Sequence, residues 1–216
     1  MTRTNRRKLA LTSAVLAVAA MTASSLPAQA ASDPGLTTTT IKLGITVPLT
    51  GIASPGYNKI PGAMKAYFDY VNANGGVNGR KISLIVKNDA YLPRQAIQNT
   101  QDLIGKDKVL AVIGALGTAN NKAVASAVNL GRRGIPSLFV NTGFSGFADR
   151  KKYPTSSMIL PSYIMEAKMI GKYVNETHPG KKICLLYQDD DFGDDALVGF
   201  DKAYGNLEFT EKVAYP

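Results

Sequence analysis

Short apolar segments alternate with amphipathic segments from residue 41 to residue 213. Strands alternating with helices in units of about 30 residues are typical of βαβ units, and therefore of a parallel sheet. Residues 109–113 are wholly apolar and β-branched, as in a strand at a sheet centre covered on both faces. We predict a doubly wound α/β fold. The expected strands are 41–47, 81–87, 109–113, 136–140, 181–187 and 207–213, and the expected helices are 60–74, 93–104, 123–131, 162–177 and 194–204.

Two lobes are expected rather than one. The βα units within residues 41–160 suffice for a first α/β lobe, and residues 141–161 form a long connection that contains several glycines and prolines. We interpret that connection as a crossover into a second lobe, which begins at residue 161. Because residues 161–216 hold too few elements to cover both faces of a parallel sheet, we expect this second lobe to be truncated at Pro216.

The first residues have the composition of an export signal. Four basic residues precede a short uncharged apolar run, and Ala28-Gln29-Ala30 provides a small-x-small cleavage pattern. We predict a cleaved signal peptide over residues 1–31 and a flexible N-terminus over residues 32–40. No cysteine lies near the cleavage site, so we expect a soluble exported protein without a lipid anchor. The single cysteine, Cys184, lies in an expected strand and is interpreted as a small buried hydrophobe.

Charge and motifs argue against nucleic-acid binding and catalysis. Without the four basic residues of the signal, 21 basic and 16 acidic residues remain, a net charge of +5, and they are scattered. No glycine-rich nucleotide motif follows a strand, so no cofactor is expected. The run Gly143–Phe147 fails the nucleophile-elbow pattern at Phe147. His178, the only histidine, stands at an expected helix end, and the acidic residues 189–195 fit helix capping better than a metal site.

The loops at the carboxyl ends of the expected strands are the candidate ligand site, because parallel sheets bind ligands there. Gly117 would allow the backbone to approach a ligand, and Thr118 is placed to cap the next helix with its hydroxyl. The free N–H groups of that helix start favour an anion such as a carboxylate. Residues 141–143 repeat the arrangement one strand further on. Each loop also has an ordinary explanation as turn and cap chemistry.

Seven segments of the chain form a recognisable series in their order and spacing. They are Pro48–Gly51, Gly75–Ile82, Asn88–Ala90, Val112–Gly114, Phe139–Gly143, Pro161–Ala167 and Asp190–Gly193. Together they resemble the leucine/isoleucine/valine-binding family of periplasmic binding proteins, and the resemblance extends over residues 40–216.

The resemblance implies a two-lobed clamshell that closes over a solute and delivers it to the permease of an ABC importer. Gly117 and Thr118 match positions that hold an amino acid's carboxylate and ammonium. The sequence departs from the family's pattern at Gly117–Ala119 and at residues 141–143, so an aromatic acid, another carboxylate or an amide stays open as the ligand. The further candidate ligand-binding residues are Asn141, Thr142, Gly143, Phe192, Tyr57 and Tyr163.

The resemblance thus predicts a monomeric, exported solute-binding subunit that captures an amino acid or a related small carboxylate or amide. Its partners would be the solute and the permease subunits. Three alternatives stay open: the ligand-sensing domain of a receptor or chemotaxis system, an exported α/β enzyme, and a non-functional fragment.

Overall fold

The computed structural model describes residues 33–203 and 207–216, so the expected signal peptide lies outside the described residues. Five parallel strands form the first sheet, in the order β2-β1-β3-β4-β5. Two further parallel strands, β6 and β7, form a second sheet. In chain order the first sheet consists of β1 (Thr40–Val47), β2 (Lys81–Asn88), β3 (Ala111–Ile113), β4 (Ser137–Val140) and β5 (Ser156–Met158). The strands of the second sheet are β6 (Cys184–Gln188) and β7 (Glu211–Tyr215).

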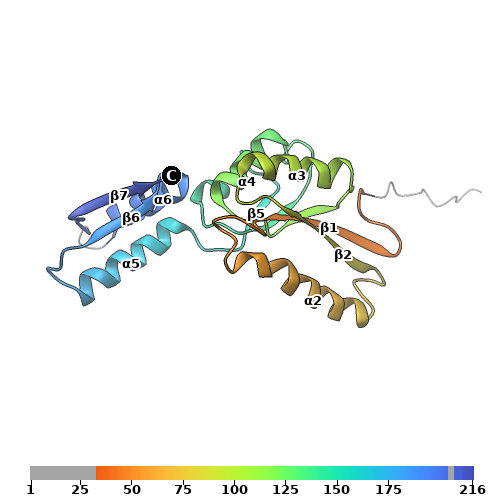
Figure 1. The fold of residues 1–216 in the computed structure, drawn as a ribbon, viewed down its shortest axis with the longest axis horizontal. Coiled ribbons are helices and arrows are strands. Elements are labelled where there is room, and N and C mark those ends of the chain that lie inside the picture. Colours follow the sequence, from red (N-terminus) through yellow and green to blue (C-terminus); the bar gives the residue numbers. More distant parts are fainter. Residues whose placement is uncertain (1–32, 204–206) are drawn as a thin grey trace, which may run out of the picture. The chain divides into compact units, whose positions relative to one another are not determined.

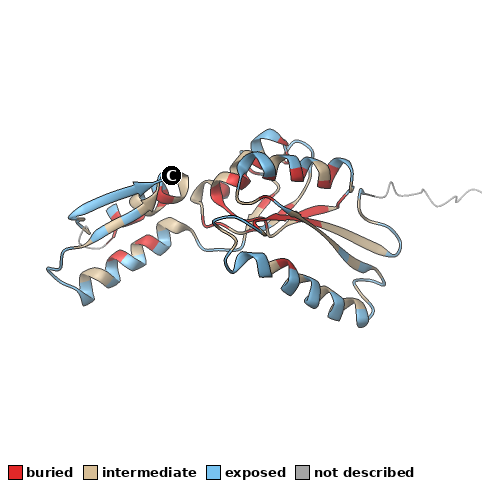
Figure 2. Cartoon of the chain, viewed as in Figure 1, coloured by how far each residue is buried: buried red, intermediate tan, exposed pale blue. Residues whose placement is uncertain are grey.

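Helices cover both faces of the first sheet, which together with them is called the first lobe. The helix α2 (Ile60–Ala73) lies on one face, and α3 (Pro93–Gly105) and α4 (Thr118–Ala127) lie on the other (Figure 1). The prediction of a doubly wound α/β fold is therefore confirmed. Buried side chains concentrate in the middle of the sheet and on the faces of α3 and α4 that pack against it (Figure 2).

Local sequence explains where these helices begin and end. Pro93 occupies the first turn of α3, where its missing N–H has no helical partner to lose. The helix α2 ends at the predicted Asn74-Gly75-Gly76, and both glycines have positive φ values, of 96° and 70°.

Residues 35–42 hydrogen-bond among themselves, and Arg80 and Lys81 donate to the carbonyls of Thr37 and Thr39. The flexibility of residues 32–40 stays a prediction.

The second lobe, built around β6 and β7, contains α5 (Tyr163–Thr177) and α6 (Asp191–Asp201). These two helices pack closely, since a Cβ added at Gly199 would lie 2.5 Å from the Cβ of Ala167. Leu185 and Tyr187 line a hollow with residues of both helices, so α5 and α6 lie on one side of the sheet. Cys184 is exposed, so its interpretation as a buried hydrophobe is wrong. Successive side chains of a strand point to opposite faces of the sheet, so Cys184 and Leu185 lie on different faces. No described element covers the face on which Cys184 lies.

Element boundaries differ from the predictions in a few places. The short strand β5 was not expected inside the connection 141–161, which also contains a 3-10 turn at Ser145–Ala148. The helices α4 and α6 begin earlier than predicted, and β7 begins four residues later. Within the described residues, no helix is long and apolar enough to span a bilayer.

Candidate functional site

Six of the eight predicted site residues lie around one cavity of about 170 Å³. It lies at the carboxyl ends of β1 to β4, as expected for a ligand site of an open parallel sheet. The second lobe contributes the first residues of α5 and α6. The residues that line the cavity are Ala53, Tyr57, Tyr91, Leu116, Gly117, Thr118, Asn141, Leu160, Tyr163 and Phe192.

Gly117 forms the N-cap of α4 and allows close approach of an aromatic ring. Its φ of 99° and ψ of 144° belong to a region that side chains disfavour. A Cβ at Gly117 would lie 2.7 Å from Cε2 of Tyr91 and 3.1 Å from its hydroxyl oxygen. The space beside Gly117 is therefore occupied by Tyr91, which gives this glycine a packing role besides any approach to a ligand.

Thr118 does not cap α4, so this part of the prediction is wrong. It is the first residue of the helix, and no side chain accepts a hydrogen bond at the cap. Its Oγ1 lies 2.6 Å from Oγ1 of Thr142, and both side chains are buried. The paired hydroxyls join the loops after β3 and β4. Thr142 does not line the cavity, and its Oγ1 also accepts a hydrogen bond from the Phe144 N–H.

The loops after β3 and β4 are joined by backbone hydrogen bonds as well. The Asn141 N–H donates to the Ala115 carbonyl over 2.9 Å, and the Gly117 N–H donates to the Asn141 carbonyl over 3.2 Å. These bonds hold Asn141 at the cavity wall. Gly143 lies behind it, where a Cβ would be 2.3 Å from the Pro161 carbonyl oxygen and 2.8 Å from the Tyr163 ring. Gly143 thus gives room to the chain that brings Tyr163 to the cavity.

Four of the ten residues that line the cavity are aromatic. Tyr163 and Phe192 meet edge to face, with ring centroids 4.8 Å apart. Tyr57 and Tyr91 come from the loops after β1 and β2. Tyr91 was not among the predicted site residues, although it follows Asn88–Ala90 at a strand exit, which is the signal that could have identified it. Burial raises the pKa of the Tyr91 hydroxyl to about 12, and the charge of Asp190 adds to this effect.

A buried carboxylate holds the backbone that carries Tyr91. Asp89 is fully buried and accepts hydrogen bonds of 2.9 Å from the Thr46 hydroxyl and from the Tyr91 N–H. Asn99 donates in turn to the Thr46 hydroxyl over 3.1 Å. Burial raises the pKa of Asp89, and its hydrogen bonds partly oppose that shift. Since Tyr91 has a φ of 63°, these bonds stabilise a conformation that a tyrosine rarely adopts.

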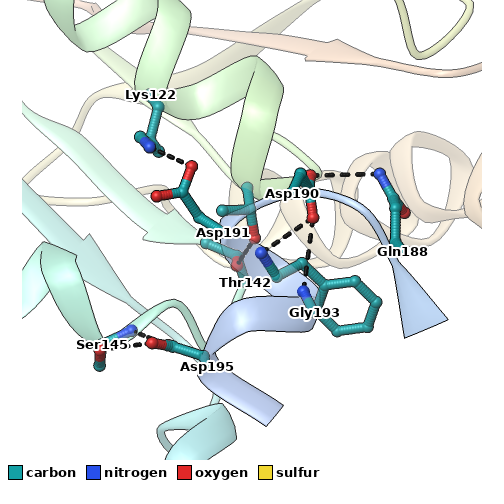
Figure 3. Close-up of polar contacts among 10 residues, drawn as sticks. Lys122, Thr142, Ser145, Gln188, Asp190, Asp191, Gly193 and Asp195 are labelled. Carbon is teal, nitrogen blue, oxygen red and sulfur yellow. Dashed lines mark hydrogen bonds and ion pairs between the residues drawn. The ribbon is translucent and has the colours of Figure 1, made fainter. Parts of the chain in front are cut away.

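The acidic segment 189–195 caps and anchors α6, as its capping interpretation predicts. The Asp190 carboxylate accepts hydrogen bonds from the N–H groups of Phe192 and Gly193 (Figure 3). Asp191 pairs with Lys122 of α4, and Asp195 accepts from Ser145. In the described part of the chain, no group of three or more potential ligands could hold a metal ion. His178, as expected, is the C-cap of α5.

The cavity lining is polar in places but carries no formal charge. Among the described residues that line it, none is acidic or basic. The first N–H groups of a helix have no intrahelical acceptor, and at α4 these groups follow Gly117 at the cavity wall. Their dipole favours an anion there. The described geometry thus combines a carboxylate-compatible helix start with aromatic walls.

Comparison with known proteins identifies the family. The model of the family described as periplasmic binding protein matches residues 40–216. The chain belongs to the periplasmic binding protein family. Members of this family bind solutes and are not enzymes. The parallel α/β fold agrees with this membership.

Individual relatives of the family are similar to parts of this chain. An "Amino acid binding protein" of Pseudomonas aeruginosa is 37% identical over 101 residues, which are 46% of this chain and 25% of the relative. A fatty acid ABC transporter substrate-binding protein of Thermomonospora curvata is 25% identical, with a TM-score of 0.74 over 85% of this chain and 46% of its own.

A solute-binding protein of an ABC transporter from Rhodopseudomonas palustris was solved in complex with 3,4-dihydroxybenzoic acid. It is 27% identical, with a TM-score of 0.68 over 82% of this chain and 47% of its own. The chain therefore spans half or less of the length of these relatives.

Proposed function

We propose that this protein is the extracellular solute-binding subunit of an ABC importer. It captures an amino acid or a related small carboxylate or amide in the cavity and delivers it to the permease subunits. The observation that carries the proposal is the cavity itself, where loops from four strands of the first lobe face Tyr163 and Phe192 of the second. Relatives with similar folds are named as substrate-binding proteins of ABC transporters.

The proposed binding mode assigns one group of residues to each end of the solute. A carboxylate or amide oxygen accepts hydrogen bonds at the start of α4, beside Gly117 and Thr118. The Asn141 amide offers both a donor and an acceptor at the same wall. The hydrocarbon or ring part of the solute lies against the aromatic walls.

The aromatic walls support a solute with an apolar or planar group. The rings of Tyr57, Tyr91, Tyr163 and Phe192 bury a ring or a branched chain efficiently, because aromatic pairs gain from offset and edge-to-face contact. A similar protein binds 3,4-dihydroxybenzoic acid, which has both a planar ring and a carboxylate. Closure of the two lobes then removes water from the solute, and the binding energy stabilises the closed state.

A thermal-shift screen tests this function. The probes are L-leucine, L-isoleucine, benzoate, 3,4-dihydroxybenzoate and benzamide. A probe at about one hundred times its dissociation constant stabilises the native state by about 2.7 kcal/mol, which raises the melting temperature by roughly 5–10 °C. Phe192→Ala should reduce this shift, and Tyr70→Ala, which removes an exposed ring on α2, should leave it unchanged. The absence of a shift with every probe would contradict the proposal.

Export is the second part of the proposal. Proteins of this family are exported, and residues 1–31 carry the expected signal pattern. Mass spectrometry of the protein recovered from the periplasm or the medium should give an N-terminus that starts close to Ala31. Recovery of the intact leader on the exported protein would contradict cleavage.

A further inference from the structure

Two acidic side chains of α6 reach back to the first lobe, one turn apart. Asp191 forms an ion pair with Lys122 on α4. Asp195 accepts two hydrogen bonds from Ser145, one of 2.5 Å from its N–H and one of 2.8 Å from its hydroxyl. Figure 3 shows both contacts, one at the start of α6 and one a turn further along the helix. Positions four residues apart lie on one face of a helix, so both side chains face the first lobe.

The Asp195 contact is the stronger of the two. Asp195 is only 7% exposed, and both of the hydrogen bonds described above come to it from Ser145. Hydrogen bonds to a charged carboxylate contribute more than hydrogen bonds between neutral groups, so this contact favours the arrangement in which α6 lies against Ser145. The Lys122 and Asp191 side chains are 29% and 41% exposed, which makes their ion pair weaker and sensitive to salt. Lys122 also lies over the Phe144 ring, 5.2 Å from its centroid.

These contacts flank the residue that α6 contributes to the cavity. Phe192 follows Asp191 directly, and its N–H is held by the Asp190 cap. The cap therefore ties Phe192 to the first turn of α6. None of the four contacting residues lines the cavity, so they act on a solute only through the position of Phe192.

We propose that the pairs Lys122–Asp191 and Ser145–Asp195 form a clasp that positions Phe192 over the solute and slows solute release. The clasp rests on the proposed function, because it acts on the same cavity. With the clasp formed, the closed arrangement is favoured before any solute binds. A solute then spends less of its binding energy on closure, and opening for release requires both contacts to break.

The first test needs no solute. 4-Fluorophenylalanine is placed at position 192, and its ¹⁹F resonance reports the ring's environment beside Tyr163. Lys122→Glu places like charges together and should shift or broaden the resonance. The charge-swapped double variant Lys122→Glu/Asp191→Lys should restore it. Lys106→Glu, which disrupts the surface pair with Asp102, is the matched control and should leave the resonance unchanged. An unchanged resonance in Lys122→Glu would overturn the clasp.

The second test measures solute release with the probe that gives the largest thermal shift among the five named above. Lys122→Glu should raise the dissociation constant by about 1.5- to 5-fold, and Asp195→Asn by roughly tenfold or more, mainly through a faster dissociation rate. Asp201→Asn, on the last residue of α6, is the control and should change neither.

The two tests separate the clasp from the proposed function. If no probe binds but the ¹⁹F resonance responds as described, the importer function fails while the contact that positions Phe192 stands. If a probe binds the native protein and Asp195→Asn releases it at the native rate, the clasp fails and the function stands. Charge-swap rescue of the ¹⁹F resonance would support the Lys122–Asp191 contact as the cause, because the double variant restores the ion pair while both positions stay substituted.

Discussion

Replacement of Gly117 by alanine tests how the cavity is built. The backbone at Gly117 has φ 99° and ψ 144°, a combination that costs a residue with a side chain about 1–3 kcal/mol. The added Cβ would also lie 2.7 Å from Cε2 of Tyr91, closer than carbon atoms approach in folded proteins. Displacing that ring costs about 1–3 kcal/mol more, as for other overpacked sites. Alanine restricts the unfolded chain, which offsets about 0.4–1 kcal/mol.

The net expectation is a loss of roughly 1–5.5 kcal/mol in the free energy of unfolding. Even the lower figure lowers the melting temperature of a chain of this size by about 2–4 °C. Because Tyr91 is displaced, solute affinity should fall as well. A double variant, Gly117→Ala/Tyr91→Ala, removes the ring and should recover the overpacking part, which gives a coupling energy of about 1–3 kcal/mol between the two positions.

Urea denaturation of the four proteins in this cycle provides the measurement. Gly62→Ala is the matched control, since Gly62 is helical and a Cβ there would meet no atom within 4 Å. Alanine at that position should stabilise α2 by about 0.5–1 kcal/mol. If Gly117→Ala unfolds at the same urea concentration as Gly62→Ala, or if the cycle shows no coupling with Tyr91, the account of Gly117 as the site of close ring approach is refuted.

Three further predictions follow from the buried groups and the helix packing. Because the pKa of Asp89 is raised by burial, its stabilising contribution is present below its ordinary pKa of 3.8 and is lost as pH rises through the folded-state value. The free energy of unfolding of the native protein should therefore fall as the pH rises from 3.8 through the folded-state pKa of Asp89. Asp89→Asn should remove this fall, as measured by urea denaturation at a series of pH values, and an unchanged pH dependence in the variant would contradict the prediction. In an ultraviolet titration one tyrosine should ionise near pH 12 rather than 10.0, and Tyr91→Phe should abolish that step; its persistence in the variant would show that another tyrosine is responsible. Gly199→Ala should destabilise the protein by about 1–3 kcal/mol, since its Cβ would lie 2.5 Å from that of Ala167, and a melting temperature like that of Gly62→Ala would exclude tight packing of α5 on α6.

The alternation of strands and helices could be read from the sequence because it depends on local pattern. The strand β1 and the helices α2 and α3 lie within two residues of their predicted boundaries. The short strand β5 could not be predicted, since Ser156–Met158 has neither a long apolar run nor clear alternation. It exists because it pairs with β4, a long-range contact that local pattern does not encode.

The cavity was predicted at the level of loops and less well at the level of side chains. Gly117 and Asn141, predicted from the rule that ligands bind at strand exits, and Phe192, predicted from the family resemblance, line one cavity. Whether they bind a solute stays a proposal. In the structure Gly117 and Gly143 also have a packing role that was not predicted, because a glycine at a strand exit gives room to any close neighbour. At Gly117 and Gly143 the neighbours in the structure are tyrosine rings from elsewhere in the chain.

The acidic segment shows where sequence reasoning stops. Adjacent aspartates before a helix predict capping, and Asp190 does cap α6. The partners of Asp191 and Asp195 are 69 and 50 residues away, and nothing near Lys122 or Ser145 in the sequence identifies them. Only the fold brings those residues to the first turn of α6. A charged cluster that looks like simple capping in the sequence therefore also joins the two lobes, and the chemistry of such a cluster must be judged from the surfaces that meet it.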